Sequence, residues 1–269
     1  MLFDFSLCLL DDVQPWGEPP NLSLSWFGFT IGFYRLKLGS IYLLNYSEQF
    51  INHWDHKFLD AYNGSLVDYQ VVRLWEDVLD LLPYTLEPVP TELHKFLTMD
   101  YATWSSWYDK AVDWRENQLE SGSDKDEVWE IMNVATSWRY NRWLNAGYLQ
   151  NAPNIWIWST DEAVSISWDN QNITVEGISV WSAIRGTLSM TQSQFLDEVR
   201  AFDNELISQM GQRVESICAN WDRSEIFVDI AGLKREQRER SLWLEKALQK
   251  TSSTEWNQVF AAIDVMSIE

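Results

Sequence analysis

Apolar and polar residues alternate along the first 46 positions, and this period of two predicts short β-strands. The first strand is expected over residues 3–9, and the closely spaced apolar runs after it indicate an antiparallel meander. Ser47 then has the position of an N-cap and predicts a short helix that continues through Trp54. The further strands are expected at 22–29, 33–38 and 41–45, with turns at 30–32 and 39–40.

A helical spacing of three and four residues replaces the alternation from residue 67 onward. It predicts one helix over 67–82, which Pro83 is expected to end, and another over 101–119 with a single aromatic stripe. The polar run 120–127 is expected to form an exposed loop before a further helix that reaches Trp143. Because that helix is apolar on two sides, it should lie inside the structure.

The second half of the chain repeats the order of strands followed by helices. Thr191 and Gln194 resemble a capping box at the start of a long helix that extends to Ile217. Apolar periodicity before and after that helix predicts the remaining elements. Strands are expected at 154–158, 163–168, 173–175, 180–190 and 226–228, and the last helices at 231–250 and 253–266.

The order β, α, β, α predicts the α+β class, because strands and helices gather in separate groups. We expect two antiparallel β-meanders, one N-terminal and one central, packed with a Trp-rich helical layer and long C-terminal helices. One unit is expected over 1–120 and another over 121–269, packed intimately or forming a single domain. The stretch Trp138–Trp181 is expected to join the two halves, mainly as core.

Composition narrows the class of protein. A chain of 269 residues, 46% of them hydrophobic, is long enough to bury a large core. Its formal net charge of -20 disfavours nucleic acid and anionic membranes, so a basic protein is the natural partner. Cys8 and Cys218 stand alone, which indicates a reducing compartment. No apolar run approaches the roughly 20 residues that cross a bilayer, and we expect a cytoplasmic protein.

Residue types that carry catalysis or bind metals are sparse. The three histidines are His53, His56 and His94, and the first two lack a third metal ligand at a defined spacing. We find no nucleophile motif and no glycine-rich loop of the kind that cradles phosphate. The sequence therefore predicts no catalytic residue, no metal and no cofactor.

Two groups of charged residues on predicted helices raise the question of a ligand site. Glu76 and Asp77 are adjacent and point about 100° apart, so a solvated face with a bridge to Arg73 is expected. Arg139 and Arg142 are less usual, because they lie three positions apart on a Trp-rich helix. Either they pair with acidic residues, or they hold an anion in a Trp-lined pocket. The residues of this candidate pocket are Trp138, Arg139, Arg142 and Trp143.

Acidic residues also gather, and they offer a candidate surface for a basic partner. A negative field speeds and orients association with a positively charged protein, and neighbouring tryptophans would anchor it. The alternative is that the charge only keeps the protein soluble. The residues of this candidate surface are Glu120, Asp124, Asp126, Glu127, Asp161, Glu162 and Asp169.

Long runs of uncommon composition extend over nearly the whole chain. They include Val13–Pro19, Leu24–Gly28, Ala152–Trp156 and Val180–Ala183. Together these runs resemble a family of uncharacterised bacterial proteins known only as a domain of unknown function. The resemblance implies no catalytic residue, because that family carries no established activity.

Two functions remain open at this point. In general character, an acidic and Trp-rich α+β protein is similar to the immunity proteins, or antitoxins, that bacteria pair with secreted toxins. The leading hypothesis is a non-enzymatic binding protein that neutralises a basic, cognate toxin domain by occluding its active site. The alternative is an enzyme or small-ligand binder with a Trp-lined pocket and an Arg-held anionic ligand.

Overall fold

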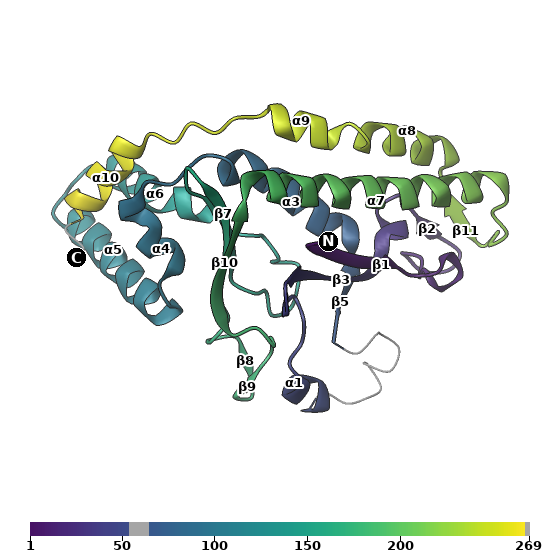
Figure 1. Cartoon of the computed structure of the whole chain (residues 1–269), viewed down its shortest axis with the longest axis horizontal. Coiled ribbons are helices and arrows are strands. Elements are labelled where there is room, and N and C mark those ends of the chain that lie inside the picture. Colours follow the sequence, from purple (N-terminus) through teal and green to yellow (C-terminus); the bar gives the residue numbers. More distant parts are fainter. Residues whose placement is uncertain (54–64, 267–269) are drawn as a thin grey trace.

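The computed structural model of the chain describes residues 1–53 and 65–266, and it has the α+β class that the sequence predicts. Figure 1 shows the long helix α7 lying along the molecule with α8 and α9 beside it, while α4, α5, α6 and α10 gather at one end.

The end of the predicted helix at Trp54 lies outside the described residues. Its predicted start is confirmed, because the Ser47 hydroxyl accepts a bond from Phe50 N (3.0 Å) ahead of α1 (Glu48–His53).

The N-terminal sheet is built around the eight-residue strand β3 (Ile31–Leu38). β1 (Phe3–Leu7) pairs along one edge, and β4 (Ile41–Leu43) shares the other edge with β5 (Val67–Gln70), all antiparallel. Because β5 comes from the start of the predicted helix over 67–82, the sheet is not the simple meander that the sequence predicts.

Two predictions about the N-terminal strands are wrong. The chain leaves β2 (Leu22–Leu24) for a 3-10 turn at Gly28–Thr30, so the strand expected over 22–29 is short. β2 pairs in parallel with the distant β11 (Ile226–Val228). Of the turn expected at 30–32, Thr30 ends the 3-10 turn, whereas Ile31 and Gly32 already belong to β3. Gly32 lies so close to the backbone of Ser6 that a side chain would collide with it. Glycine is needed here for close approach, not for turning.

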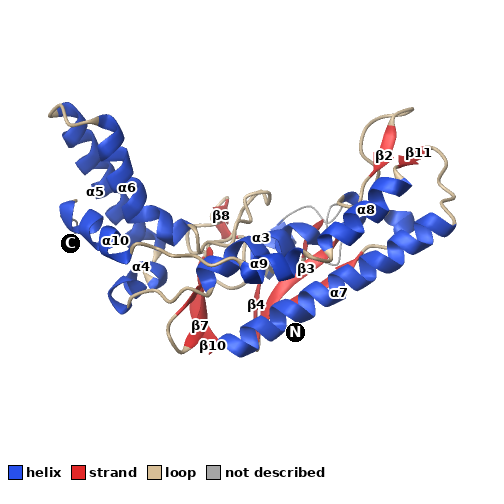
Figure 2. Cartoon of the chain, turned by 90° about the horizontal axis from the view of Figure 1, so that it is seen from above, coloured by secondary structure: helices blue, strands red, loops and turns tan. Residues whose placement is uncertain are grey.

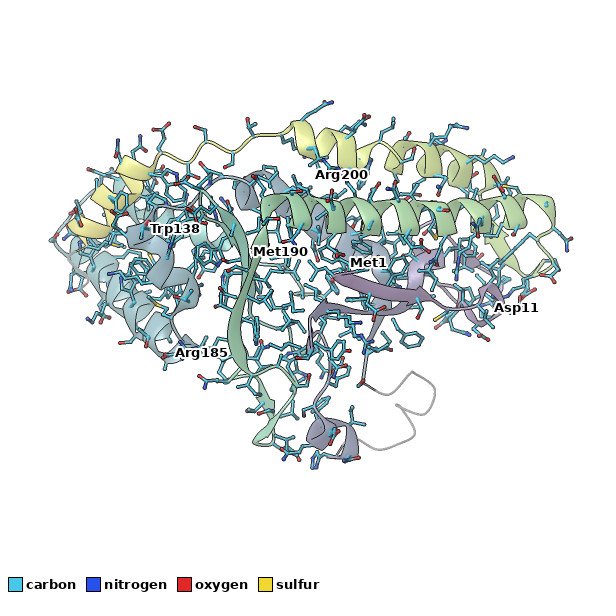
Figure 3. All side chains as sticks on the ribbon, viewed as in Figure 1. Met1, Asp11, Trp138, Arg185, Met190 and Arg200 are labelled. Carbon is cyan, nitrogen blue, oxygen red and sulfur yellow. The ribbon has the colours of Figure 1, made fainter. Side chains whose placement is uncertain are left out.

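Helix α3 (Val71–Thr85) does not end at Pro83, contrary to expectation. A proline lacks the N–H that would bond to the carbonyl four residues earlier, so one helical bond is missing, but the last turn still forms. The turn closes around it, because Leu86 N donates to Leu82 O over 3.0 Å. α3 buries most of its apolar residues, and it contacts β3, β5, α7 and α9, with side chains filling the space between these elements (Figure 3).

The Trp-rich helical layer consists of η3 (Thr91–Leu93), α4 (His94–Thr98), α5 (Tyr101–Glu120) and α6 (Lys125–Tyr140). Only four residues of the expected loop over 120–127 lie between α5 and α6. Asp124 is the N-cap of α6, accepting bonds from Asp126 N and Glu127 N, each at 3.0 Å. A capped helix therefore begins inside the polar run, and it ends before Trp143.

The central sheet separates two hydrophobic cores. β6 (Ile155–Ser159), β7 (Ala163–Asp169) and β10 (Arg185–Thr191) pair antiparallel in the order β10-β7-β6. Along β6, Ile155 and Ile157 face the large core under α7, whereas Trp156 and Trp158 face the second core between α4, α5, α6 and α10. The strand expected over 173–175 is β8 (Thr174–Val175), which forms a small hairpin with β9 (Ile178–Ser179), and the strand expected over 180–190 begins only at Arg185.

The capping box is confirmed, because Thr191 and Gln194 bond reciprocally at the start of α7 (Gln192–Ala219). The helix expected over 231–250 is divided into α8 (Ile230–Arg240) and α9 (Trp243–Gln249). In Figure 1 an extended segment then leads to α10 (Trp256–Val265) on the second core. Both cores take residues from either side of position 120, and the division at 120 stays a prediction.

Candidate functional site

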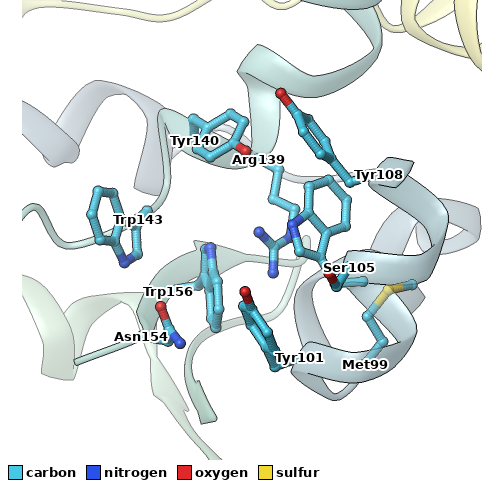
Figure 4. Close-up of a pocket in the computed structure, with 10 residues that line it drawn as sticks. Met99, Tyr101, Ser105, Tyr108, Arg139, Tyr140, Trp143, Asn154 and Trp156 are labelled. Atoms are coloured by element: carbon cyan, nitrogen blue, oxygen red, sulfur yellow. The ribbon is translucent and has the colours of Figure 1, made fainter. Parts of the chain in front are cut away.

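A pocket of about 310 Å³ lies at the edge of the second core, where α5, the end of α6 and β6 meet (Figure 4). Its walls are mainly aromatic and come from Tyr101, Trp104, Tyr108, Tyr140, Trp143 and Trp156. Met99, Ser105, Asn154 and Arg139 complete the lining. The volume and the apolar walls with a few polar groups are those of a small-molecule site.

The first turn of α5 is anchored to the central sheet, and this places the aromatic wall. Asp100 caps the helix by accepting from Thr103 N (2.7 Å), and the buried Asp169 of β7 accepts from Tyr101 N (2.7 Å). Trp104, one turn further along, stacks on Trp107 with ring centroids 5.1 Å apart and planes 21° apart. The pocket wall is therefore set by residues of the helix and sheet, which are more rigid than a loop.

Arg139 provides the charge of the pocket. It is 3% exposed, and its Nε donates to Phe96 O over 2.7 Å. The guanidinium carbon lies 3.9 Å from the Trp104 ring centroid and 4.1 Å from that of Trp156. Across the described residues no carboxylate forms an ion pair with it. Burial lowers the pKa of Arg139 to about 9, because the charged form has lost water without gaining an anion.

Further donors of the pocket also lack partners. The indole nitrogens of Trp143 and Trp156 are buried and make no hydrogen bond within the described part of the chain. Figure 4 shows the Arg139 guanidinium, the Trp156 ring and the Tyr101 hydroxyl converging on one space. Indole and guanidinium groups donate and do not accept, so an occupant must supply acceptor atoms.

Two of the four predicted pocket residues do not line the pocket. Arg142 is fully buried and pairs with Glu87 over 2.9 Å, while its Nη1 donates to Trp138 O (2.8 Å). Trp138 is 2% exposed and packs edge-on against Trp256. Helix α6 ends at Tyr140, so Arg142 lies in the turn beyond it and does not share a helical face with Arg139. Only Arg139 and Trp143 remain from the prediction. Pairing with an acid, the alternative expectation, is correct for Arg142.

The acidic residues of the candidate surface fall into exposed and buried sets. Glu120, Asp124, Asp126 and Glu127 are exposed around the tip of the α5–α6 hairpin, which projects from the body in Figure 2. Asp161 and Glu162 are exposed in the turn between β6 and β7. Asp169 is the exception, because it is 2% exposed and accepts from the backbone nitrogens of Tyr101 (2.7 Å) and Gln171 (3.1 Å). Asp169 is therefore a structural residue and the prediction of a partner contact there is wrong.

The histidines have structural contacts. His53 Nε2 lies 2.9 Å from Glu176 Oε2, and His94 Nε2 lies 2.8 Å from Val89 O. His56 is outside the described residues. In residues 1–53 and 65–266 no three potential ligands among His, Cys, Asp and Glu come together in a way that would hold a metal ion.

The expectation of a solvated Glu76–Asp77 face is only half right. Glu76 pairs with Arg73 (3.3 Å), as expected, and also with Arg240 (2.7 Å). Asp77 is partly buried instead. Burial raises its pKa to about 7, although the hydrogen bond from Tyr148 acts to lower it. Its Oδ2 has no hydrogen-bond partner among the described residues. Asp77 is an uncompensated acid at the edge of the large core.

Most of the pocket was not identified from the sequence. The sequence predicts a single aromatic stripe on α5 and no ligand for it, and Trp104, Trp107 and Ala111 of that stripe lie in the second core. Tyr101 and Tyr108 were the available signal, because a hydroxyl at helical spacing marks where a stripe meets water. Both tyrosines line the pocket beside Trp104.

Comparisons with known proteins identify the family of the chain, but no individual relative. Residues 2–262 match the family of unknown function DUF5984, which confirms the resemblance seen in the sequence. No curated protein and no solved structure matches the chain. Among the described residues, no helix combines the length and the apolar character that crossing a bilayer requires.

Proposed function

Since the chain belongs to the DUF5984 family, whose function is unknown, we propose from its own geometry that it binds a small organic anion in the Arg139 pocket. The observation that carries this proposal is a buried guanidinium without a carboxylate. An unpaired buried charge costs several kcal/mol, and a bound anion would offset that cost. The proposal follows the ligand-binding alternative of the sequence analysis, centred on Arg139 and Trp143. It assigns binding and no reaction.

A ligand screen tests the proposal. The full-length protein is titrated with a panel of anionic metabolites and nucleotides, followed by Trp fluorescence and thermal shift. A ligand that binds only the folded state raises its stability, by about 2.7 kcal/mol at a hundredfold excess over Kd. The signal should be strong, because Trp104, Trp143 and Trp156 all line the pocket.

Arg139→Gln and Arg200→Gln make a matched pair of variants. Arg139→Gln removes the charge in the pocket, and loss of a charge-assisted hydrogen bond should weaken binding about ten- to a hundredfold. Arg200 is half exposed on α7 and pairs with Asp197 over 3.2 Å, so its substitution should leave binding unchanged. Binding that survives Arg139→Gln, or an absence of any hit, contradicts the proposal.

We propose as a second candidate that the acidic hairpin tip binds a basic protein, as an immunity protein would bind and occlude a toxin domain. One observation favours it. Trp129 is 45% exposed on α6, next to the exposed acids Asp126 and Glu127. An exposed tryptophan within a negative field combines an anchor with electrostatic steering. The two cysteines are unpaired, which supports a cytoplasmic location for this role.

Co-purification with the product of a neighbouring gene tests the second candidate. Asp124→Ser keeps the helix cap, and Asp126→Asn with Glu127→Gln removes two further charges. This triple variant should bind the partner about tenfold more weakly at low salt, and less so at high salt. Glu205→Gln with Glu215→Gln, at two exposed positions of α7 outside the candidate surface, is the control for a general charge effect. No binding to any neighbouring toxin, or binding indifferent to salt and to the triple variant, would refute this candidate.

A further inference from the structure

We infer that the Arg139 pocket selects a single carboxylate carried on a flat aromatic body, and that it discriminates against phosphate esters and amines. The inference rests on the proposed anion-binding function and names the ligand class of the same site. Three features of the described residues support it: the free edge of the guanidinium, the charge count of the lining and the donor character of the walls.

The guanidinium offers one free edge. Its Nε is committed to Phe96 O at 2.7 Å, and the rings of Trp104 and Trp156 lie against it at 3.9 and 4.1 Å. Its two terminal nitrogens make no hydrogen bond to another described residue. Two parallel N–H groups in one plane match the two oxygens of a carboxylate.

The residues that line the pocket can neutralise a ligand with one negative charge but not a ligand with two. Arg139 is the one charged side chain among the described residues that line the pocket. The nearby cations are committed elsewhere, because Arg142 pairs with Glu87 (2.9 Å) and Arg185 with Asp100 (3.6 Å). A phosphate monoester carries close to two charges at neutral pH and offers three oxygens. In a chain with a net charge of -20, its second charge would remain unmatched.

The walls favour a flat body with oxygen acceptors. The indole N–H groups of Trp143 and Trp156, which have no partner among the described residues, add donors at the pocket wall, and the positive charge of Arg139 repels an ammonium group. Tyr101 and Tyr140 are 44% and 45% exposed, so the aromatic lining continues to the surface. Aromatic walls pack best against a planar, apolar ligand. A volume of about 310 Å³ accommodates one aromatic ring with its acid group.

Four probes with one phenyl ring separate the possible head groups. Benzoate, phenyl phosphate, benzamide and benzylamine are titrated into the full-length protein at constant ionic strength, by calorimetry and Trp fluorescence. Benzoate should bind at least about tenfold more tightly than benzamide, because a charge-assisted bidentate pair is about twice as strong as a neutral one. Phenyl phosphate should bind at least about tenfold more weakly than benzoate, and benzylamine should not bind.

Acidification gives an independent readout. Phenyl phosphate takes up a proton near pH 6, so its affinity should rise between about pH 7.5 and pH 5 as it becomes a monoanion. Benzoate stays a monoanion over this range, and its affinity should not change. Arg139→Gln should reduce the affinity for benzoate to that for benzamide, whereas Arg200→Gln should not. Trp143→Phe keeps an aromatic ring and removes one hydrogen-bond donor. It replaces Arg139→Gln in this test if the Arg139 variant does not fold.

Two outcomes overturn the inference in different ways. If phenyl phosphate binds as tightly as benzoate, or if the metabolite screen yields only Arg139-dependent ligands without a carboxylate, the ligand class is wrong and the anion-binding function stands. If neither the probes nor the screen gives Arg139-dependent binding, both are wrong. Arg139-dependent selection of benzoate over the other three probes supports both.

Discussion

Two arginines near the end of α6 are buried in regions that treat the same charge differently. Arg142 is fully buried against Glu87, and Arg139 is buried against two indole rings with no carboxylate. Burial alone would raise the pKa of Glu87, but hydrogen bonds from Thr254 and the charge of Arg142 lower it. The charge of Arg142 is therefore paired within the chain, although its Nε has no hydrogen-bond partner among the described residues, whereas Arg139 has no carboxylate partner there.

Arg142 has a structural role that Arg139 does not have. Glu87 accepts from Thr254 N and from the Thr254 hydroxyl, so the Arg142 pair also fixes the segment that leads to α10. Arg139 holds no comparable segment beyond the carbonyl of Phe96. A buried pair fails when one partner is removed, while an unpaired buried charge already carries its desolvation cost. The two regions should therefore respond differently to the same substitution.

The largest effect is expected from Arg142→Met. The substitution leaves Glu87 buried without its counter-charge, and it should lower the free energy of unfolding by about 3–5 kcal/mol. Chemical denaturation followed by circular dichroism measures this loss. Combining it with Glu87→Gln should recover part of the stability, because no uncompensated charge then remains. A loss below about 1 kcal/mol would show that the pair contributes little to the fold.

Asp77→Asn should raise the free energy of unfolding, whereas Arg142→Met lowers it. The folded-state pKa of Asp77, about 7, lies above the ordinary value of 3.8, so the folded chain holds this proton more tightly. The contribution of this group to the free energy of unfolding is fully present below about pH 4 and is lost as the pH rises to about 7. At pH 8 the variant should gain on the order of 2 kcal/mol, since Asn carries no charge and can still bond to Tyr148. Equal unfolding curves for both proteins at pH 8 would contradict this account.

Ligand affinity should fall at high pH. Burial lowers the pKa of Arg139 to about 9, so the cation that holds the ligand begins to lose its proton there. Affinity for a carboxylate should be constant from about pH 6 to pH 8 and should drop about tenfold by about pH 10. Calorimetric titration across this range tests the point. An affinity that stays flat to pH 10 would mean that burial does not lower the pKa of Arg139 this far, and the Arg139→Gln variant would then decide whether Arg139 holds the anion.

The smallest effect on stability is expected from Arg139→Met. It leaves no acid unpaired, and a flexible apolar side chain fits between two indole rings. The net change should be within about 1 kcal/mol, because removal of an unpaired buried charge offsets the lost bond to Phe96 O. Any loss should be clearly below that of Arg142→Met. Denaturation of both variants under one set of conditions provides the ranking. If Arg139→Met is the more damaging of the two, the contrast between the regions is wrong.

Local patterns in the sequence predicted local structure well. α5, α6 and the capping box of α7 follow from periodicity and from caps that act within four residues. The parallel pairing of β2 with β11 was not predictable in this way, because more than 200 residues separate the strands. The same holds for β5, whose first apolar residues fit a helix until β3 offers them an edge.

The candidate site illustrates the same limit. Arg139 and Trp143 were found because they lie four positions apart in one Trp-rich stretch of the sequence. Asn154 and Trp156, from the start of β6, reach the pocket only in the folded chain. Arg142 was indistinguishable from Arg139 until the structure placed Glu87 beside it, 55 residues earlier in the chain. A sequence shows which cations are unusual, but pairing decides which of them is available to a ligand.

The stacking of Trp104 on Trp107 also has an optical consequence. Two indoles 5.1 Å apart couple their electronic transitions, so the far-ultraviolet circular dichroism should contain an exciton couplet in addition to the helical signal. Because Trp104 lines the pocket, a ligand should alter this couplet without any change in helix content. The stacked pair Trp75 and Trp243, 5.5 Å apart in the large core, supplies an internal reference that the ligand does not touch.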